Sequence, residues 1–241
     1  MTTLVIPAVH IGVRAAIGDV ATLIGRSVRL TRRDAETLVM SIALPLMMMA
    51  LFVYVFGGAI STGGEYIDYV VPGIILLCTG FGAAGTATSV AADMAVGMID
   101  RFRSLPIRSS AVLSGHVVAS VARNTLATAV VIVAALAMGF GPDAGPAEWL
   151  LATGLLLLYV LALSWLAVGL GALAGSVESA NALSFAMLFL PYLSSAFVPI
   201  DTMPGFLRAI ADHQPITPVI ETVRGLLTGT PVGSSGWTAT A

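Results

Sequence analysis

Charged side chains that could bind a partner are concentrated in one short segment, residues 93–108, with the sequence DMAVGMIDRFRSLPIR. Acidic and arginine side chains at this density suit charge-assisted hydrogen bonds with another protein surface. Long runs that are almost entirely apolar lie on both sides of the segment. We interpret it as a structured contact surface, and the alternative is a solvated connector.

Enzyme chemistry has little support in the rest of the chain. His10, His116 and His213 lie in different regions, and neither an H-E-x-x-H nor a G-x-S-x-G pattern occurs. No second histidine or cysteine stands at metal-ligand spacing from His116, so we expect neither catalytic residues nor a metal site. The single Cys78 is expected to be a small buried side chain.

The basic residues limit the possible partners. All eleven are arginine, and the absence of lysine excludes a P-loop of the form G-x-x-x-x-G-K-[ST]. An ATP-driven function would therefore need a second chain that binds the nucleotide, and we expect no cofactor in this one. The net charge is −2 and the arginines form no continuous patch, so a nucleic-acid partner is not expected.

Apolar runs are the elements that must position these residues. The composition is 57% hydrophobic and 10% charged, which a bilayer can solvate and water cannot. Each run exceeds the roughly 20 residues needed to cross a bilayer as a helix. The sequence therefore predicts an all-α, polytopic membrane helical bundle with five clear spans, in the runs 37–64, 69–92, 109–142, 149–177 and 179–200.

The first 36 residues have a different pattern. Apolar residues recur every three or four positions from Val13 to Val28, with arginines between them. This pattern predicts an amphipathic helix at the membrane interface, and the alternative is a surface helix of a soluble lobe. A signal peptide is not expected, because the start of the chain has no basic segment before its apolar residues.

Arginine placement predicts the orientation. Eight arginines lie before the first span or between the second and third spans. By the positive-inside rule, the N-terminus and residues 93–108 are predicted to be cytoplasmic. The loops on the opposite side contain no basic residue and four acidic ones, Glu65, Asp68, Asp143 and Glu148.

Arg123 interrupts the third run. As one helix, residues 109–140 would be about 48 Å long, which exceeds a hydrocarbon thickness of about 30 Å. The cytoplasmic end must then project from the core, and Arg123 falls near the inner boundary, where it can snorkel. The alternative places Arg123 on a substrate path. Further candidates for such a path, or for an outer aromatic belt, are Phe52, Tyr54, Phe56, Tyr192 and Phe197.

Other features of the spans indicate apolar contacts. No Asp or Glu lies in the middle of a span, so a proton relay lacks its usual residues. A lipid-like or amphipathic cargo fits better than an ion or a sugar. Small residues at Gly80–Gly85 and at Gly171-x-x-x-Gly175 are predicted to allow close helix packing.

Residues 199–229 form a turn-rich outer segment. Two short amphipathic stretches, GFLRAIADH and VIETVRGLL, are joined by a proline turn, with Thr217 predicted as an N-cap and Pro218 as the first helical residue. Glu221 and Arg224 are spaced so that they can pair. We predict a hairpin that dips into the outer leaflet, and the alternative is a packed loop with no transport role.

Several groups of residues form motifs along the chain. The first span has Arg32 before it, Pro45 within it and Phe56-Gly57 at its end. A D-x-x-x-G-x-x-x-R-x-R-x-x-P pattern follows the second span, at Asp93, Gly97, Arg101, Arg103 and Pro106. An F-x-P-x-x-x-M-P-x-x-L pattern follows the fifth span, at Phe197, Pro199, Met203, Pro204 and Leu207. A P-x-T-P-x-x-x-x-x-R-x-L-L-x-G pattern comes next, at Pro215, Thr217, Pro218, Arg224, Leu226, Leu227 and Gly229.

In this order, the motifs resemble the permease subunit of type-2 ABC exporters, in particular the daunorubicin-exporter-like branch. The resemblance extends over residues 26–229 and implies one transmembrane domain over 1–241. Its expected parts are a cytoplasmic amphipathic helix at 1–36, five spans at 37–198 with a coupling helix at 93–107, and an extracytoplasmic hairpin at 199–229.

The chain departs from the family in two ways. Family members usually have a basic residue and an acid where this chain has His116 and Ser120, so we assign no polar role to either. The family also has six spans, whereas this sequence ends at GWTATA, where a sixth would begin. We expect a trimmed chain without its last span, and the alternative is a natural five-span protein.

The resemblance also implies partners. Two permease copies, or one copy and a paralogue, would pair and bind two cytoplasmic ABC ATPase subunits, which would hold ATP and magnesium. In the coupling helix, Asp93 would favour the N-terminal end and Gly97 would permit close approach. Arg101 and Arg103 would contact acidic groups of the ATPase, and Pro106 would end the helix.

The expected function is export of a hydrophobic or amphipathic drug, antibiotic or lipid across the bacterial cytoplasmic membrane, in contact with membrane lipids. The chain itself is expected not to be an enzyme. The alternative is a secondary transporter or a flippase without an ATPase partner. A secondary transporter would need ionisable coupling groups at the midplane, which are missing apart from Arg123.

Overall fold

The computed structural model describes residues 35–60, 62, 64–96 and 109–230. In these residues every regular element is a helix, which confirms the predicted all-α class. The predicted interfacial helix falls almost wholly outside them. The elements are α2 (Ala35–Ala50), the π-helix η1 (Leu51–Phe56), α3 (Tyr66–Ala95), α5 (Ser109–Ala137), α6 (Pro146–Leu173), α7 (Val177–Phe189), the 3₁₀-helices η2 (Pro191–Leu193) and η3 (Ile200–Thr202), α8 (Gly205–His213) and α9 (Ile216–Thr228).

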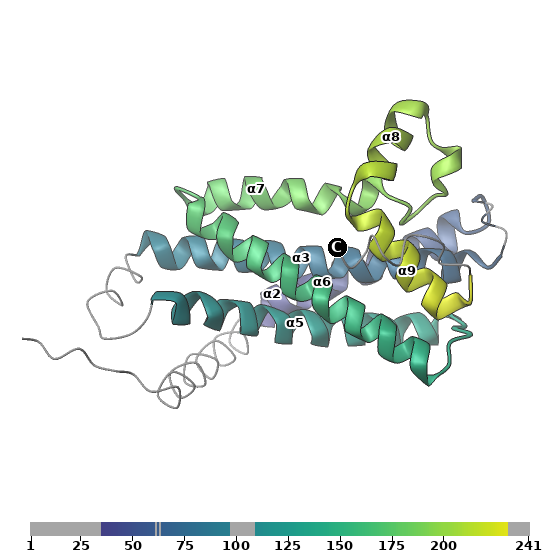
Figure 1. Cartoon of the computed structure of the whole chain (residues 1–241), viewed down its shortest axis with the longest axis horizontal. Coiled ribbons are helices and arrows are strands. Elements are labelled where there is room, and N and C mark those ends of the chain that lie inside the picture. Colours follow the sequence, from purple (N-terminus) through teal and green to yellow (C-terminus); the bar gives the residue numbers. More distant parts are fainter. Residues whose placement is uncertain (1–34, 61, 63, 97–108, 231–241) are drawn as a thin grey trace, which may run out of the picture.

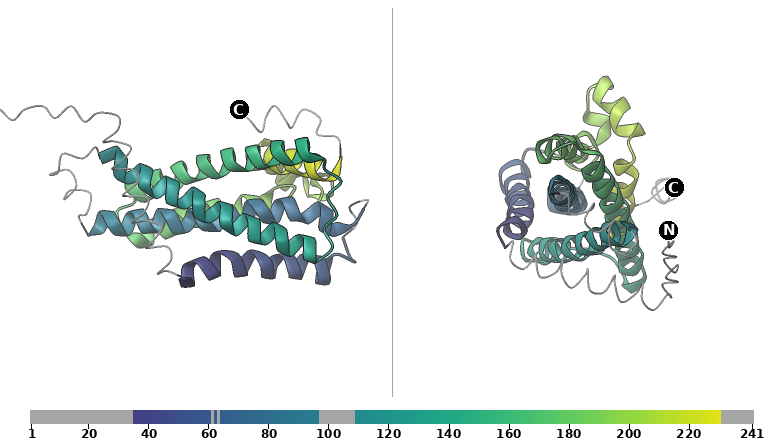
Figure 2. Two further views of the ribbon diagram at one scale, coloured as in Figure 1. Left: turned by 90° about the horizontal axis from the view of Figure 1, so that it is seen from below. Right: turned by 90° about the vertical axis from the view of Figure 1, so that its left-hand side faces the viewer.

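Helix α3 lies at the centre of the bundle. The helices α2, α5, α6 and α7 run along it on different sides, and α8 and α9 lie at one end (Figures 1 and 2). In its most apolar stretch 83% of α3 is buried, compared with 33% for α5 and 39% for α6. The outer helices therefore keep an apolar surface that a bilayer can solvate.

In the described part of the chain, three helices are long and apolar enough to cross a membrane: Tyr66–Ala95, Leu113–Ala137 and Pro146–Leu173. Two shorter apolar helical stretches, Ser41–Phe56 and Val177–Leu193, accompany them. The third apolar run forms one long helix, as predicted. The structure thus confirms a helical bundle with membrane-spanning character.

The fifth apolar run is helical over a shorter stretch than its composition predicts. Ser176 caps the beginning of α7, because its Oγ accepts a hydrogen bond from the Ser179 amide at 3.1 Å. The α-helix ends at Phe189, and Pro191 opens the 3₁₀-helix η2, since proline has no amide hydrogen for an α-helical bond. The chain then turns, instead of continuing as a helix to Ile200.

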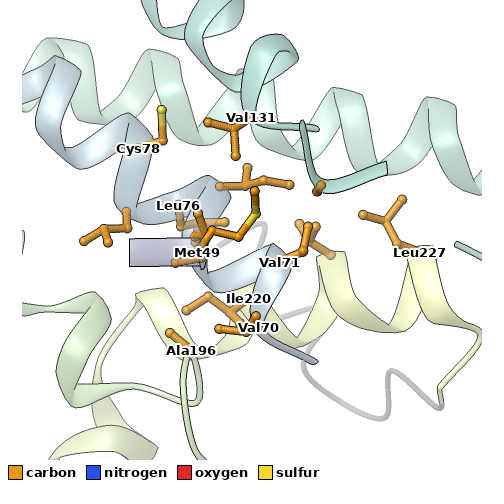
Figure 3. Close-up of a cluster of buried hydrophobic side chains, with 14 of the residues drawn as sticks. Met49, Val70, Val71, Leu76, Cys78, Val131, Ala196, Ile220 and Leu227 are labelled. Carbon is orange, nitrogen blue, oxygen red and sulfur yellow. The ribbon is translucent and has the colours of Figure 1, made fainter. Parts of the chain in front are cut away.

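The main hydrophobic core joins α2, α3, α5, α6, α9 and the turn after η2. Met49, Val71, Val131 and Ile220 are completely buried in it, and they come from four different helices (Figure 3). Cys78 is buried in the same core, as predicted for a small apolar side chain. This core fixes α9 against the spans, so the segment after the fifth run is part of the bundle.

The segments predicted to lie on the outer side meet at one end of the bundle. The Gly141 amide donates to Asp68 Oδ1 at 3.0 Å, which joins the loop after α5 to the beginning of α3. The Asp143 amide donates to the Leu227 carbonyl at 2.9 Å, which joins the same loop to the end of α9. Asp93 and the Ala174–Ser176 connection lie at the opposite end (Figure 1).

Glycines allow the close approach of helices to α3. A Cβ at Gly82 would overlap the Asn124 amide of α5, and a Cβ at Gly171 would overlap the Ala87 carbonyl of α3. Both positions confirm the predicted packing role. Gly80 and Gly175 have room for a Cβ, so the prediction does not hold for them.

We expect Gly171→Ala to lower the free energy of unfolding by about 1–3 kcal/mol, because the added methyl group must push α6 away from α3. Gly169→Ala is the matched control, since a Cβ at Gly169 meets nothing within 4 Å. It should be neutral or slightly stabilising. The measurement is the thermal unfolding midpoint of the purified protein in lipid nanodiscs. Equal midpoints for the two variants would contradict the packing role of Gly171.

Candidate functional site

Four of the six candidates for a substrate path, Phe52, Phe56, Tyr192 and Phe197, come together in a row of aromatic rings. The Phe52 and Phe197 rings stack with centroids 4.4 Å apart, and the Phe197 and Tyr192 rings stack at 5.2 Å. The centroid of the Phe56 ring lies 5.5 Å from the centroid of the Phe52 ring. These contacts connect η1 to the turn after α7, which are about 140 residues apart in sequence.

Two residues that the sequence analysis missed extend the row along α7. The Phe189 ring is 6.3 Å from Tyr192, and the Phe185 ring is 5.5 Å from Phe189. The spacing of 185, 189 and 192 places all three on one helix face, so this periodicity could have identified them. We define the aromatic row as Phe56, Phe52, Phe197, Tyr192, Phe189 and Phe185.

The aromatic row has a buried anchor and an exposed surface. Phe197 is 6% exposed, whereas Tyr192 is 37%, Phe189 53% and Phe185 56% exposed. The row therefore offers a surface of ring faces and edges to a molecule outside the chain. Such a surface suits apolar and aromatic partners.

Backbone contacts hold the anchor of the row in place. The Tyr66 hydroxyl donates to the Phe197 carbonyl at 2.9 Å. Next to it, Ala196 packs so closely on α3 that a Cβ at Gly73 would lie only 2.6 Å from the Ala196 Cβ. The turn that follows Pro191 is thus pressed against α3, and Phe197 is directed toward Phe52.

Arg123, another candidate for the path, lies apart from the aromatic row. Its guanidinium donates to Thr86 Oγ1 at 2.7 Å and to the Gly82 carbonyl at 3.3 Å, both on α3. Thr86 is 13 residues beyond Gly73, or about 20 Å along the helix. The structure therefore does not bring Arg123 together with the other four residues.

Arg123 borders a buried polar cluster that joins three helices. Ser120 Oγ of α5 lies 2.9 Å from Thr86 Oγ1 of α3 and 2.9 Å from Ser164 Oγ of α6. The Asn124 amide adds a bond of 3.3 Å to Ser120. Thr86, Ser120, Asn124 and Ser164 are each at most 2% exposed. The expectation of no polar role at Ser120 is therefore wrong, because its hydroxyl is the centre of this cluster.

Most of the predicted coupling segment lies outside the described residues, including Gly97, Arg101, Arg103 and Pro106. Asp93 lies in the last turn of α3, so the expectation that it begins a helix is wrong. Its Oδ2 is 3.1 Å from Nε2 of His116 on α5, which donates to it. His116 thus has a polar role after all: it ties together the ends of the two helices that flank residues 97–108.

Arg224 fixes the predicted outer hairpin to the bundle. It is 9% exposed, and its guanidinium lies 3.8 Å above the centre of the Tyr69 ring. Its Nε donates to the Tyr69 carbonyl at 3.1 Å, and an Nη donates to the Ser195 carbonyl at 2.6 Å. Burial lowers the pKa of Arg224, and the Tyr69 and Glu221 side chains counteract this effect. The charge is thus buried among carbonyl, ring and carboxylate partners.

The hairpin prolines lie at element boundaries. Pro199, Pro204 and Pro215 directly precede η3, α8 and α9, and Met203 directly follows η3. Helix α8 has the predicted bounds. Helix α9 begins at Ile216, so Thr217 is not its N-cap and Pro218 is its third residue. The Thr217 hydroxyl instead donates to the Ala211 carbonyl at 2.7 Å, which joins α9 to α8.

These features define an integral membrane protein with an aromatic surface, in which the central helix α3 and the outer helix α5 flank a charged segment. The family of ABC-2 type transporters matches residues 19–228, and the chain belongs to this family. The resemblance drawn from the motifs is thereby confirmed, and the protein is a membrane-embedded permease of the ABC transporter class.

Curated relatives match most of the chain. The daunorubicin resistance ABC transporter permease protein DrrB1 of Streptomyces coeruleorubidus is 30% identical over 217 residues, which cover 89% of this chain and 77% of the relative. A protein of Mycobacterium tuberculosis named "Probable doxorubicin resistance ABC transporter permease protein DrrC" is 23% identical over 227 residues, which cover 90% of this chain and 82% of the relative.

We expect Arg224→Met to loosen the hairpin, because it removes the donors to the Tyr69 and Ser195 carbonyls and retains the apolar stem. Hydrogen bonds to charged groups contribute about 1.5–3 kcal/mol, so the local free energy of opening should fall by about that amount. Hydrogen exchange of residues 195–228 measures the effect. Arg224→Lys keeps the charge, but an ammonium group cannot donate to both carbonyls with the geometry of a guanidinium. Its exchange rates should lie between those of the wild type and of Arg224→Met. Wild-type exchange in both variants would contradict this role.

Proposed function

We propose that this chain is the permease subunit of an ATP-driven exporter that moves a hydrophobic or amphipathic compound out of the cell, such as a drug, an antibiotic or a lipid. The observation that carries the proposal is the aromatic row, a partly exposed series of contacting rings on an ABC-2 bundle. The names of the relatives, which refer to daunorubicin and doxorubicin resistance, support a drug as cargo.

The cargo would move along the aromatic row by apolar and ring-stacking contacts. Each aromatic contact contributes about 0.5–1.5 kcal/mol beyond burial, so a row of them can hold an apolar molecule without trapping it at one point. Phe185 and Phe189 on α7 and Phe56 on η1 would form the two ends of the path. The buried Phe197, which stacks on both Phe52 and Tyr192, would hold these two ends in fixed positions relative to each other.

Energy would come from ABC ATPase subunits that hold ATP and magnesium. Family membership supports the association with two such subunits and with a second permease copy or a paralogue. Residues 93–107 would contact the ATPase. The hydrogen bond between His116 and Asp93 supports this role, because a displacement of the segment would reach both α3 and α5.

The proposed topology has five spans, a cytoplasmic N-terminus and an outer hairpin that dips into the leaflet. The loop after α5 is hydrogen-bonded both to the beginning of α3 and to the end of α9. These contacts support the placement of the three segments on the same side of the membrane. The arginines at residues 101–108 support a cytoplasmic location for the other end. Helix α2 with η1 and helix α7 with η2 would be the two shorter spans.

We expect Arg101→Glu and Gly97→Trp to uncouple ATP hydrolysis from export, because they alter the surface that contacts the ATPase. Arg208→Glu makes the same charge change at the opposite end of the bundle, on the exposed helix α8, and should retain coupling. The assay is cargo-stimulated ATPase activity of the copurified complex in proteoliposomes. If no ATPase subunit copurifies with the wild-type chain, or if both variants keep normal stimulation, the coupling role is wrong.

Removal of one ring from the aromatic row should slow export and leave the basal ATPase activity unchanged. For Phe189→Ala we expect a roughly 2- to 10-fold lower rate of dye or drug efflux from intact cells, given the strength of aromatic contacts. Phe206→Ala on α8 is the matched control, since Phe206 is exposed but lies outside the row. An equal effect of the two variants would exclude the row as the path.

A further inference from the structure

A cavity of about 420 Å³ lies between α6 and α7, apart from the aromatic row. The two helices are joined at Ala174–Ser176 and diverge toward α9 (Figure 1). Its lining includes Gly80 of α3, Ala162 of α6, Met187 of α7 and Ile216 of α9. The volume falls in the range of about 300–1,000 Å³ that is typical of small-molecule sites.

The lining of this cavity is suited to a ligand without polar groups. Among the described residues, its lining contains no charged side chain, and Tyr159 is the only polar side chain in it. Binding sites for drug-like molecules place a few polar groups that fix the orientation of the ligand, and the described lining offers at most the Tyr159 hydroxyl.

The cavity opens on a surface that faces the bilayer. Leu158 and Leu166 on its α6 wall are each about half exposed. Apolar cavities of this kind do not hold water and take up apolar molecules. A helix of a second copy is too thick, since a cylinder about 10 Å across would fill this volume within roughly one turn. The surrounding solvent is hydrocarbon, so lipid chains have access to the cavity.

We infer that the cavity between α6 and α7 binds one acyl chain of a membrane phospholipid. The chain fills the space left where the two helices diverge and contacts α3 and α9 at the same time. The inference rests on the membrane location and the cavity alone. It is therefore independent of the cargo and of the ATPase partner.

The test uses the purified complex in nanodiscs of phosphatidylcholine that carries a photoactivatable diazirine on one acyl chain. Mass spectrometry of the crosslinked peptides should show labels on both walls, in residues 155–166 and 187–191. Ala162→Trp fills the cavity from the α6 side and Met187→Trp from the α7 side. Each should lower the labelling of the opposite wall roughly tenfold, because even two lost methylene contacts weaken binding to that extent.

Leu161→Trp is the matched control, since Leu161 is the exposed neighbour of Ala162 and does not line the cavity. It should leave the labelling at the wild-type level, and the unfolding midpoint shows whether each variant is folded. Even labelling of all lipid-facing residues of α6, or unchanged labelling in both cavity-filling variants, would overturn the inference. Normal labelling in a complex that exports nothing would leave it intact and refute only the proposed function.

Discussion

Enclosure of α3 by four other helices is the constraint on which the rest of the structure depends. An enclosed helix in a bilayer can bury almost all of its side chains only where its neighbours come close to its backbone. Gly82 and Gly171 provide that approach, one on α3 itself and one on α6. The hydroxyl groups of Thr86, Ser120 and Ser164 are then hydrogen-bonded to one another inside the contact.

The enclosed helix also connects the two ends of the molecule. Near its beginning, Tyr69 holds Arg224 of the hairpin, and in its last turn Asp93 holds His116 beside residues 97–108. A rigid helix that is held at both ends transmits displacement along its axis, because its core packing resists compression. Helix α3 thus connects the end of the bundle beside residues 97–108 with the hairpin, whose Arg224 also donates to the Ser195 carbonyl, two residues before Phe197 of the aromatic row.

Local features of the fold could be predicted from the sequence, and contacts between distant segments could not. The apolar runs, the bounds of α8 and the packing role of Gly82 follow from composition and spacing, which a single chain displays directly. The aromatic residues of the path could be named but not placed, since Phe52 and Phe197 meet only after the chain turns behind Pro191. The contact of Arg224 with Tyr69 spans 155 residues, and no local pattern indicates it. The buried position of Ser120 depends likewise on which face of α5 meets α3 and α6.

The π-helix at Leu51–Phe56 gives the end of the first span an unusual property. A π-helical turn contains more residues than the 3.6 of an α-helix, so the backbone is slightly unwound there relative to an α-helix. Rewinding this stretch by one residue would rotate everything after it by about 100° and carry the Phe56 ring away from Phe52. The π-helical turn therefore sets the angle at which the end of the first span presents the Phe56 ring to Phe52.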